Sequence, residues 1–413
     1  MEKKELIALY EDYQREKLAL NMARGRPSDA QLNRVQEIMD EVALDHPSHA
    51  QNGTDCRNYG GDPGGIFEMK AIFADMVKTD PDKVLALGNS SLNLMFEILS
   101  KAYYGPLPGQ KKAWREEEKV SFLCPVPGYD RHFSILEYLG IFMIPIPMTK
   151  EGPDLDEILE HMKKDPSIRG MICVPKYSNP DGYVYSEEVC RRLAQMDAPE
   201  DFLVIWDNAY ACHHLYEEEQ KQADIPDILS LAEEAGHPNR FVEFASTSKM
   251  TYAGAGVAAL IANQEMRDWF LQSYQWRSIG PNKMVQLYHA KFFERAGGYR
   301  KLMKMHADIL RPKFERVLDI LDEELSGTGL ASWNIPLGGY FVSVNLKPGM
   351  AKKVVQMCQD AGVKLTKAGA AFPYHQDPLD QNIRLAPSYP PLEELEKAIR
   401  IFCLCVKIAG EKD

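Results

Sequence analysis

Short, continuous runs of apolar residues through the middle of the chain constrain the fold most strongly. Their apolar residues do not alternate with polar ones, which is typical of strands in a sheet that helices cover on both faces. Helical patterns such as residues 90–104 and 186–196 lie between these runs. The predicted strands are residues 83–88, 119–125, 141–147, 170–175, 202–207, 240–246 and 256–262. We therefore predict a three-layer α/β domain with a mostly parallel sheet.

The rest of the chain predicts a smaller α+β unit. Residues 282–325 form a long helical pattern, which we expect Gly297-Gly298 and Pro312 to break or bend. Strand and helix patterns then alternate toward the C-terminus. With 413 residues the chain is too long for one small core. We predict an N-terminal segment at residues 1–48 that packs with the small domain, a large domain at residues 49–305 and a small domain at residues 306–413.

The charge and the apolar content argue against two classes of partner. The formal net charge is −12, whereas nucleic acids and anionic membranes require a basic face. The apolar runs are far shorter than the ~20 residues that a membrane-spanning helix needs. Residues 1–20 mix acidic and basic residues with apolar ones, which indicates an amphipathic helix and not a signal peptide. The eight cysteines are scattered and form no CxxC pair, so we expect a cytoplasmic protein. From the charge and the short apolar runs we expect that it binds neither nucleic acid nor membrane.

Polar and aromatic residues follow the predicted strands at their carboxyl ends, the edge where open α/β sheets bind ligands. They include hydroxyls at a helix start, an aromatic ring, an amide, a carboxylate, a phenol and an amine. In chain order these residues are Ser90, Ser91, Tyr129, Asn179, Asp207, Tyr210, Ser246, Ser248 and Lys249. We expect all of them to converge on one edge of the sheet.

This set of groups matches the needs of pyridoxal 5′-phosphate. The aldehyde of that cofactor needs a lysine for a Schiff base, and Lys249 is the candidate. Its ring nitrogen needs a carboxylate, here Asp207, to stay protonated and withdraw electrons. Its ring can stack on an aromatic face such as Tyr129, and its phosphate suits a helix N-terminus with hydroxyls nearby. Those hydroxyls would come from Ser90, Ser91, Ser246 and Ser248.

With these residues identified, the sequence resembles the class I aminotransferases of fold type I. The matching motifs run in the order of that family from Gly25 to Arg384, and they are RGRP, YGGDPG, GNSS, PGY, SNPDG, WDNAY, STSKM and NIRLAPS. The spellings NMARGRPS and SNPDGYVYS are most similar to a divergent bacterial aspartate aminotransferase subgroup. The ordered set, and not any single motif, carries the resemblance.

The resemblance implies a chemical role for each matching residue. Lys249 would carry the cofactor and move a proton between the substrate Cα and the cofactor C4′. Asp207 would pair with the pyridinium nitrogen, while Asn179 and Tyr210 would hydrogen-bond the phenolic O3′. Arg384 would bind the substrate α-carboxylate as a bidentate fork.

The resemblance further implies a homodimer in which two subunits share each active site. Tyr59 would reach the phosphate from the partner subunit. Gly25 would let the N-terminal segment close over the substrate without a side chain in the way. Tyr129 would stack on the cofactor ring. The phosphate would be held by Ser90, Ser91, Ser246 and Ser248.

One position departs from the family pattern. The family usually places an arginine shortly after the lysine as a second charge on the phosphate, whereas this chain has Gly256 and Val257 around that position. We expect Lys283 to replace this arginine, from the same chain or from the partner.

Some residues also have plainer interpretations. Asp207 could cap a helix, and Arg384 could form a structural ion pair in its strand. Gly254-x-Gly256-x-x-Ala259 fits a loose dinucleotide-binding pattern. That pattern needs a strand directly before the glycines and a helix after them, whereas here the strand ends at Ser246 and another predicted strand follows. The glycines therefore favour a hairpin-like return of the chain and argue against a NAD-dependent dehydrogenase. The remaining pair, His213-His214, has no further ligands at useful spacing, so we interpret it as structural and predict no metal site.

The predicted reaction is the transfer of an amino group from an L-amino acid to a 2-oxo acid. We expect aspartate as donor and 2-oxoglutarate as acceptor, with Arg26 as the cation for the side-chain carboxylate, ahead of Arg24 and Lys283. The alternatives are an aminotransferase for aromatic or neutral amino acids and a pyridoxal-phosphate-dependent β-lyase on the same fold. A ligand-sensing regulator would need an N-terminal DNA-binding domain, and only a short helix pattern precedes NMARGRPS.

Overall fold

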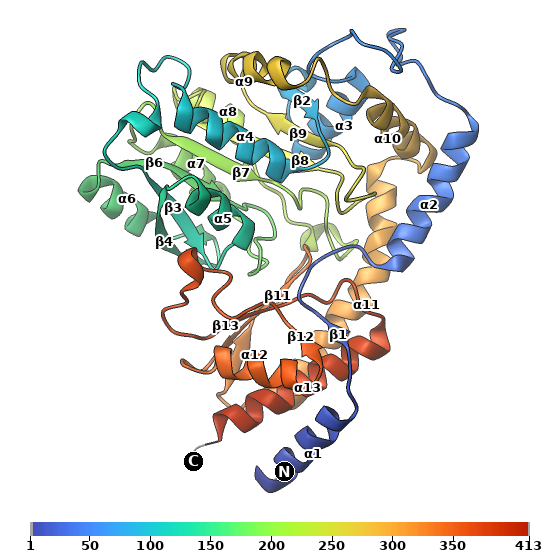
Figure 1. Cartoon of the computed structure of the whole chain (residues 1–413), viewed down its shortest axis with the longest axis vertical. Helices are drawn as coiled ribbons and strands as arrows, with labels where there is room; N and C mark the ends of the chain where they lie inside the picture. Colours follow the sequence, from blue (N-terminus) through green and yellow to red (C-terminus); the bar gives the residue numbers. More distant parts are fainter. Residues whose placement is uncertain (1–2, 412–413) are drawn as a thin grey trace.

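An eight-stranded sheet is the largest feature of the computed structural model, which describes residues 3–411 (Figure 1). Its strand order is β2-β9-β8-β7-β6-β3-β4-β5. The strands are β2 (Val84–Leu87), β3 (Ser121–Val126), β4 (Phe142–Thr149), β5 (Gly152–Pro153), β6 (Ile168–Cys173), β7 (Leu203–Asp207), β8 (Phe241–Ser246) and β9 (Ala258–Ile261). Neighbours from β8 to β4 are parallel, whereas β9 runs antiparallel to β2 and β8, and β5 runs antiparallel to β4. The mostly parallel sheet and the hairpin-like return after β8 are thus confirmed.

Helices cover both faces of this sheet, which explains why the strands are apolar throughout. In β2, Val84 and Ala86 pack into one core, while Leu85 and Leu87 pack into another. The first core is covered by α3 (Phe67–Val77), α6 (Leu155–Lys164), α7 (Glu187–Gln195), α8 (Ile228–Glu234) and α10 (Lys283–Arg295). The second is covered by α4 (Ser91–Tyr104), α5 (Asp130–Tyr138) and α9 (Gln264–Arg277). The three-layer α/β architecture is therefore present (Figure 1).

The long helical pattern is broken at its glycines and not at its proline. Gly297 and Gly298 have φ angles of +79° and +95°, a region that favours glycine, and α11 (Tyr299–Leu325) begins directly after them. The same helix continues through Pro312, so the expected break there is not found. A proline inside a helix costs about 3 kcal/mol. Flanking side chains such as Leu310 and Phe314 are buried, and each contributes roughly 1.5–3 kcal/mol, which offsets that cost.

A smaller α+β unit surrounds a third core. Its antiparallel sheet has the order β10-β11-β13. The elements are β10 (Ala331–Trp333), β11 (Val342–Leu346), β13 (Asn382–Leu385), α12 (Ala351–Asp360) and α13 (Leu392–Gly410). The short 3-10 turns of the chain are η1 (Pro81–Lys83), η2 (Trp114–Glu116), η3 (Glu219–Lys221) and η4 (Pro373–His375). No helix described between residues 3 and 411 is long and apolar enough to cross a bilayer.

The N-terminal elements divide between the two units. The helix α1 (Lys3–Arg15) packs against α13, and β1 (Leu20–Asn21) pairs in parallel with β12 (Val363–Lys364). The next helix, α2 (Asp29–Leu44), packs instead against α10 and α11. Because α11 runs without interruption through residues 305 and 306, it links the two units, and the predicted domain boundaries remain a prediction.

Candidate active site

Lys249 lies in the loop between β8 and β9, close to the carboxyl end of the parallel sheet. Its Nζ is 4.9 Å from the centre of the Tyr210 ring. Burial lowers the pKa of Lys249 from its ordinary value, and the charge of Asp207 opposes that shift. The lowered pKa favours the neutral amine, which is the form that can act as a nucleophile or a base.

Asp207 ends β7 with one carboxylate oxygen paired and the other free. The side chain is buried, and its Oδ2 lies 2.9 Å from Nε2 of His132. Its Oδ1 is also buried but has no hydrogen-bond partner within residues 3–411. Because a buried acceptor without a partner costs free energy, this oxygen leaves a place for a hydrogen-bond donor, such as a protonated ring nitrogen.

His132 is a site residue that the sequence interpretation missed. It is 2% exposed and lies in the first turn of α5. Its ring packs edge-on against Tyr129, with 5.0 Å between the ring centres. Tyr129 is the residue that caps α5, so the spacing Tyr129-x-x-His132 places both rings on one side of the first turn. This spacing at a predicted helix start is the signal that would have found it.

The N-terminus of α4 lies beside the loop after β8. Ser90 is the residue that caps α4 and makes no side-chain capping bond, and Ser91 is the first helical residue. The hydroxyl of Ser248 donates to the carbonyl of Asn89 at 3.4 Å, which joins the two loops. Ser246 is the last residue of β8, just before that loop. The free N–H groups and the dipole of this helix start suit an anion such as a phosphate.

Close packing leaves no room for a side chain at Gly256, around the position where the family usually has an arginine. A Cβ on Gly256 would lie 2.8 Å from Oγ1 of Thr247 and 2.9 Å from the carbonyl of Tyr252. The next residue, Val257, is 1% exposed. A Cβ on Gly254, by contrast, would meet no atom within 4 Å. An arginine side chain at position 256 would therefore disrupt the loop that carries the lysine.

Lys283 contacts the backbone of Gly60, the residue that follows Tyr59. Lys283 is 6% exposed, and its Nζ donates to the carbonyl of Gly60 at 2.7 Å. Tyr59, the residue before that glycine, is 78% exposed. Within residues 3–411 neither side chain hydrogen-bonds a serine of the α4 region, so the roles of these two residues stay predictions.

Arg384 in β13 reaches from the small sheet to the loop after β6 and to the start of α5. It is 7% exposed, and its Nη1 donates to Oδ1 of Asn179 at 3.1 Å and to Oδ1 of Asp130 at 3.0 Å. The Nε of Arg384 has no partner among the described residues. The ion-pair interpretation of Arg384 is thus realised, through an aspartate that the sequence interpretation missed. The guanidinium still keeps an unused N–H for a carboxylate ligand.

Gly25 packs against Phe341, whose ring faces the guanidinium of Arg384. The central carbon of that guanidinium lies 4.8 Å from the centre of the Phe341 ring. A Cβ on Gly25 would be 2.6 Å from Cζ of Phe341, so only glycine fits here. Arg26 turns elsewhere, because its guanidinium stacks 3.5 Å from the centre of the Tyr389 ring. The structure therefore brings Gly25 to the site but leaves Arg26 exposed at its border.

Two phenols of the site keep their protons at neutral pH. Burial raises the pKa of Tyr129 to about 12, and the carboxylates of Asp130 and Asp207 add to this effect. Burial also raises the pKa of Tyr210 well above its ordinary value. Each hydroxyl can therefore donate a hydrogen bond to a phenolate oxygen or a carbonyl oxygen.

The two adjacent histidines lie behind Tyr210. His213 is buried, and its ring centre lies 5.5 Å from that of Tyr210. Burial holds the pKa of His213 well below its ordinary value. Nδ1 of His214 is 2.6 Å from the hydroxyl of Tyr177, and burial lowers the pKa of His214 to about 4. Both rings are therefore neutral at pH 7.

Comparisons with known proteins agree with this arrangement. The family model described as "Aspartate amino-transferase" matches residues 2–413. An aspartate aminotransferase of Corynebacterium glutamicum is 45% identical over 402 residues, which cover 97% of this chain and 92% of that protein. The crystal structure of an aspartate transaminase from the same organism has a TM-score of 0.93 with 44% identity, over 98% of this chain and 95% of that chain. An α-aminoadipate aminotransferase of Thermus thermophilus, complexed with N-(5′-phosphopyridoxyl)-L-leucine, shares the fold with a TM-score of 0.76 and 22% identity, over 96% of this chain and 94% of that chain.

Proposed function

This chain belongs to the aspartate amino-transferase family and is an aminotransferase, and we propose that it moves the amino group of aspartate to 2-oxoglutarate with pyridoxal 5′-phosphate held at Lys249. The observation that carries the cofactor proposal is the buried, unpartnered Oδ1 of Asp207 beside that lysine. A protonated pyridine nitrogen is the donor that this oxygen lacks. The name of the Corynebacterium glutamicum relative supports aspartate as the donor.

The residues of the site fit each part of this cofactor. Asp207, with its second oxygen fixed by His132, would hold the ring nitrogen, and Tyr129 would lie against the ring. The amide of Asn179 and the hydroxyl of Tyr210 would bond the phenolic oxygen. The phosphate would be held at the start of α4, by hydroxyls of Ser90, Ser91, Ser246 and Ser248.

When bound, this cofactor withdraws electrons from the amino-acid Cα and so makes its proton acidic. Lys249 would take that proton as a general base, since burial favours its neutral form. Its amine would then return the proton on the cofactor side. Arg384 would orient the α-carboxylate through a fork of its unused Nε and the neighbouring Nη2, which lies 3.4 Å from Oγ1 of Thr366. Its Nη1 would stay bonded to Asp130 and Asn179.

We also propose that the chain acts as a homodimer with shared active sites. Three large apolar side chains are exposed in the segments that contain Gly60 and Lys283: Tyr59 is 78% exposed, Trp276 is 86% exposed and Ile279 is 69% exposed. Exposed aromatic side chains of this kind are enriched at interfaces between chains. Association through this surface would let Tyr59 and Lys283 approach the phosphate of the partner.

The substrate assignment is tested by steady-state assay of several amino donors with 2-oxoglutarate as acceptor. We expect kcat/KM for aspartate to exceed that for alanine or phenylalanine by about tenfold or more, because a second carboxylate offers an additional charged contact. A higher kcat/KM for phenylalanine would contradict aspartate as the preferred donor. Release of ammonia from a β-substituted donor in place of amino transfer would favour the β-lyase alternative.

Arg26→Ala is expected to lower kcat/KM for aspartate by about tenfold while leaving alanine turnover unchanged, because only aspartate carries a second carboxylate. Arg26 stacks on Tyr389 beside Gly25, so it would turn from that ring toward the substrate. Arg24→Ala is the matched control, since Arg24 is also exposed and lies on the other side of Gly25. Equal losses for both donors in Arg26→Ala would contradict this role.

A further inference from the structure

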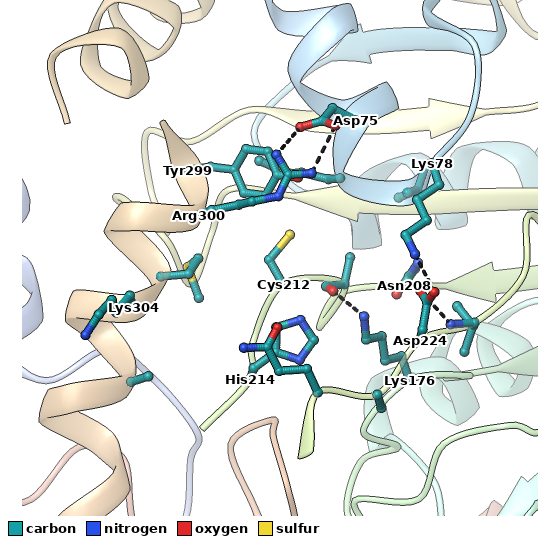
Figure 2. A pocket seen from close by; sticks show the side chains of 18 of the residues that line it. Asp75, Lys78, Lys176, Asn208, Cys212, His214, Asp224, Tyr299, Arg300 and Lys304 are labelled. Atoms are coloured by element: carbon teal, nitrogen blue, oxygen red, sulfur yellow. Dashed lines mark hydrogen bonds and ion pairs between the residues drawn. The ribbon is translucent and has the colours of Figure 1, made fainter. Parts of the chain in front are cut away.

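A cavity beside the segment that follows β7 has no part in the proposed reaction (Figure 2). It has a volume of about 530 Å³, within the usual range for sites that bind small molecules. It is enclosed by the end of α3, the segment of residues 208–225 after β7 and the first turns of α11.

The exposed cations around this cavity are already paired. Arg300 binds Asp75 through two hydrogen bonds of 2.7 and 3.0 Å. Ion pairs also join Lys78 to Asp224 and Lys304 to Glu217. Figure 2 shows the pairs of Asp75 with Arg300 and of Lys78 with Asp224 at the edge of the cavity. Because these side chains are half or more exposed, such pairs contribute little to stability and leave no unsatisfied buried charge.

Lys176 differs from these cations in both burial and pairing. It is 6% exposed, and its Nζ donates to the carbonyl of Ala211 at 2.6 Å. Within residues 3–411 no carboxylate lies within ion-pair distance of this amine. An ammonium group has three donors, so two remain without a protein acceptor among residues 3–411, beside the cavity that Lys176 lines. Burial accordingly lowers the pKa of Lys176.

The other walls of the cavity combine apolar side chains with charged and polar ones, among them the carboxylates of Asp75, Glu217, Glu219 and Asp224. Met76 and Val77 come from the end of α3, while Tyr299, Met303 and Ala307 come from α11. A ligand that fills this space therefore needs an apolar body as well as a group that pairs with the amine. A carboxylate is the small anion that an ammonium binds by charge-assisted hydrogen bonds.

We propose that this cavity binds a small organic acid, whose carboxylate pairs with Lys176 and whose apolar body packs against α3 and α11. The site adjoins the proposed active site through the chain itself. Asn208 lines the cavity and is the next residue after Asp207. Lys176 also lines the cavity and lies three positions before Asn179. An acid bound here would contact the backbone that positions those two residues.

Calorimetric titration of the holoenzyme with 3-phenylpropanoate tests this site. That probe has a carboxylate and an apolar ring but no amino group to transfer. Because Arg384 also binds carboxylates in our proposal, the titration is done on Arg384→Leu as well as on the unmodified protein. We expect Arg384→Leu to retain one binding event per chain, and Lys176→Met in that background to weaken it by about tenfold or more.

Two further variants separate a binding site from a folding defect. Lys78→Met removes a cation that lines the same cavity but is exposed and paired, so it should change the affinity by less than about threefold. Met303→Trp fills the cavity from α11 while leaving Lys176 intact, and it should abolish binding. Thermal unfolding of each variant checks that the fold is retained.

The affinity of Arg384→Leu for the probe should also fall as pH rises, because the carboxylate binds the protonated amine and Lys176 loses its proton below the ordinary lysine range. Loss of all binding in Arg384→Leu would overturn the proposal, because the probe would then occupy the active site alone. Unchanged binding in both Lys176→Met and Met303→Trp would overturn it too. Neither result bears on amino transfer at Lys249.

Discussion

Lys249→Ala is expected to lower kcat for amino transfer by at least about 10³-fold, because one side chain supplies both the cofactor attachment and the proton transfer. General acid–base catalysis alone typically contributes 10²–10⁴-fold, as an order of magnitude. The amine lies over the Tyr210 ring, and the charge of Asp207 acts on it. The measurement is the steady-state rate of amino transfer from aspartate to 2-oxoglutarate.

Lys101→Ala is the control for that experiment. Burial lowers the pKa of Lys101 to about 8, so Lys101 resembles Lys249 in having a lowered pKa. It lies in the last turn of α4, at the opposite end of that helix from Ser90. Its replacement should leave kcat within about threefold, as expected for a residue outside the site. If Lys249→Ala kept more than a tenth of the normal kcat, the assignment of Lys249 would be wrong.

Asp207→Asn is expected to lower kcat by about 10²–10³-fold, the range found when one preorganised electrostatic group is removed. The substitution keeps the size of the side chain but removes its charge. The ring nitrogen would then lose the partner that keeps it protonated, and the cofactor would withdraw electrons less effectively. Kinetics should be combined with the visible spectrum and the cofactor content, which distinguish a loss of chemistry from a loss of binding.

Glu243→Gln provides a matched control for Asp207→Asn. Glu243 is also a buried carboxyl group at the sheet, on the neighbouring strand β8, where burial raises its pKa to about 8. It accepts a hydrogen bond from Asn208 at 2.8 Å and has no place in the proposed site. We expect its loss to change kcat by less than about tenfold. Equal effects of the two substitutions would argue that Asp207 acts only through the fold.

The main sheet was predictable because its strands are buried on both faces. Burial on both faces makes runs such as residues 202–207 continuously apolar, and parallel strands bring their carboxyl ends to one edge. That is why Asp207, Tyr210 and Lys249 could be assigned to one site from the sequence. The short strand β5, of only two residues, has no such pattern and was missed.

The missed site residues depend on contacts between distant parts of the chain. Asp130 reaches Arg384 across 254 residues, and His132 reaches Asp207 across 75 residues. A single sequence contains no signal for such pairings beyond the local spacing at a helix start. Tyr59 and Lys283 depend on a second chain, which the sequence implies only through the family resemblance. Their roles therefore remain proposals.

Borohydride reduction of the holoenzyme, followed by digestion and mass spectrometry, tests the central claim most directly. Reduction makes the link between the cofactor aldehyde and its lysine permanent, so the modified residue can be read from the peptide mass. We predict a phosphopyridoxyl group on Lys249 and none on Lys176, another buried lysine whose pKa is lowered by burial. A modification on another lysine, or an unmodified Lys249 in protein that contains stoichiometric cofactor, would contradict the account.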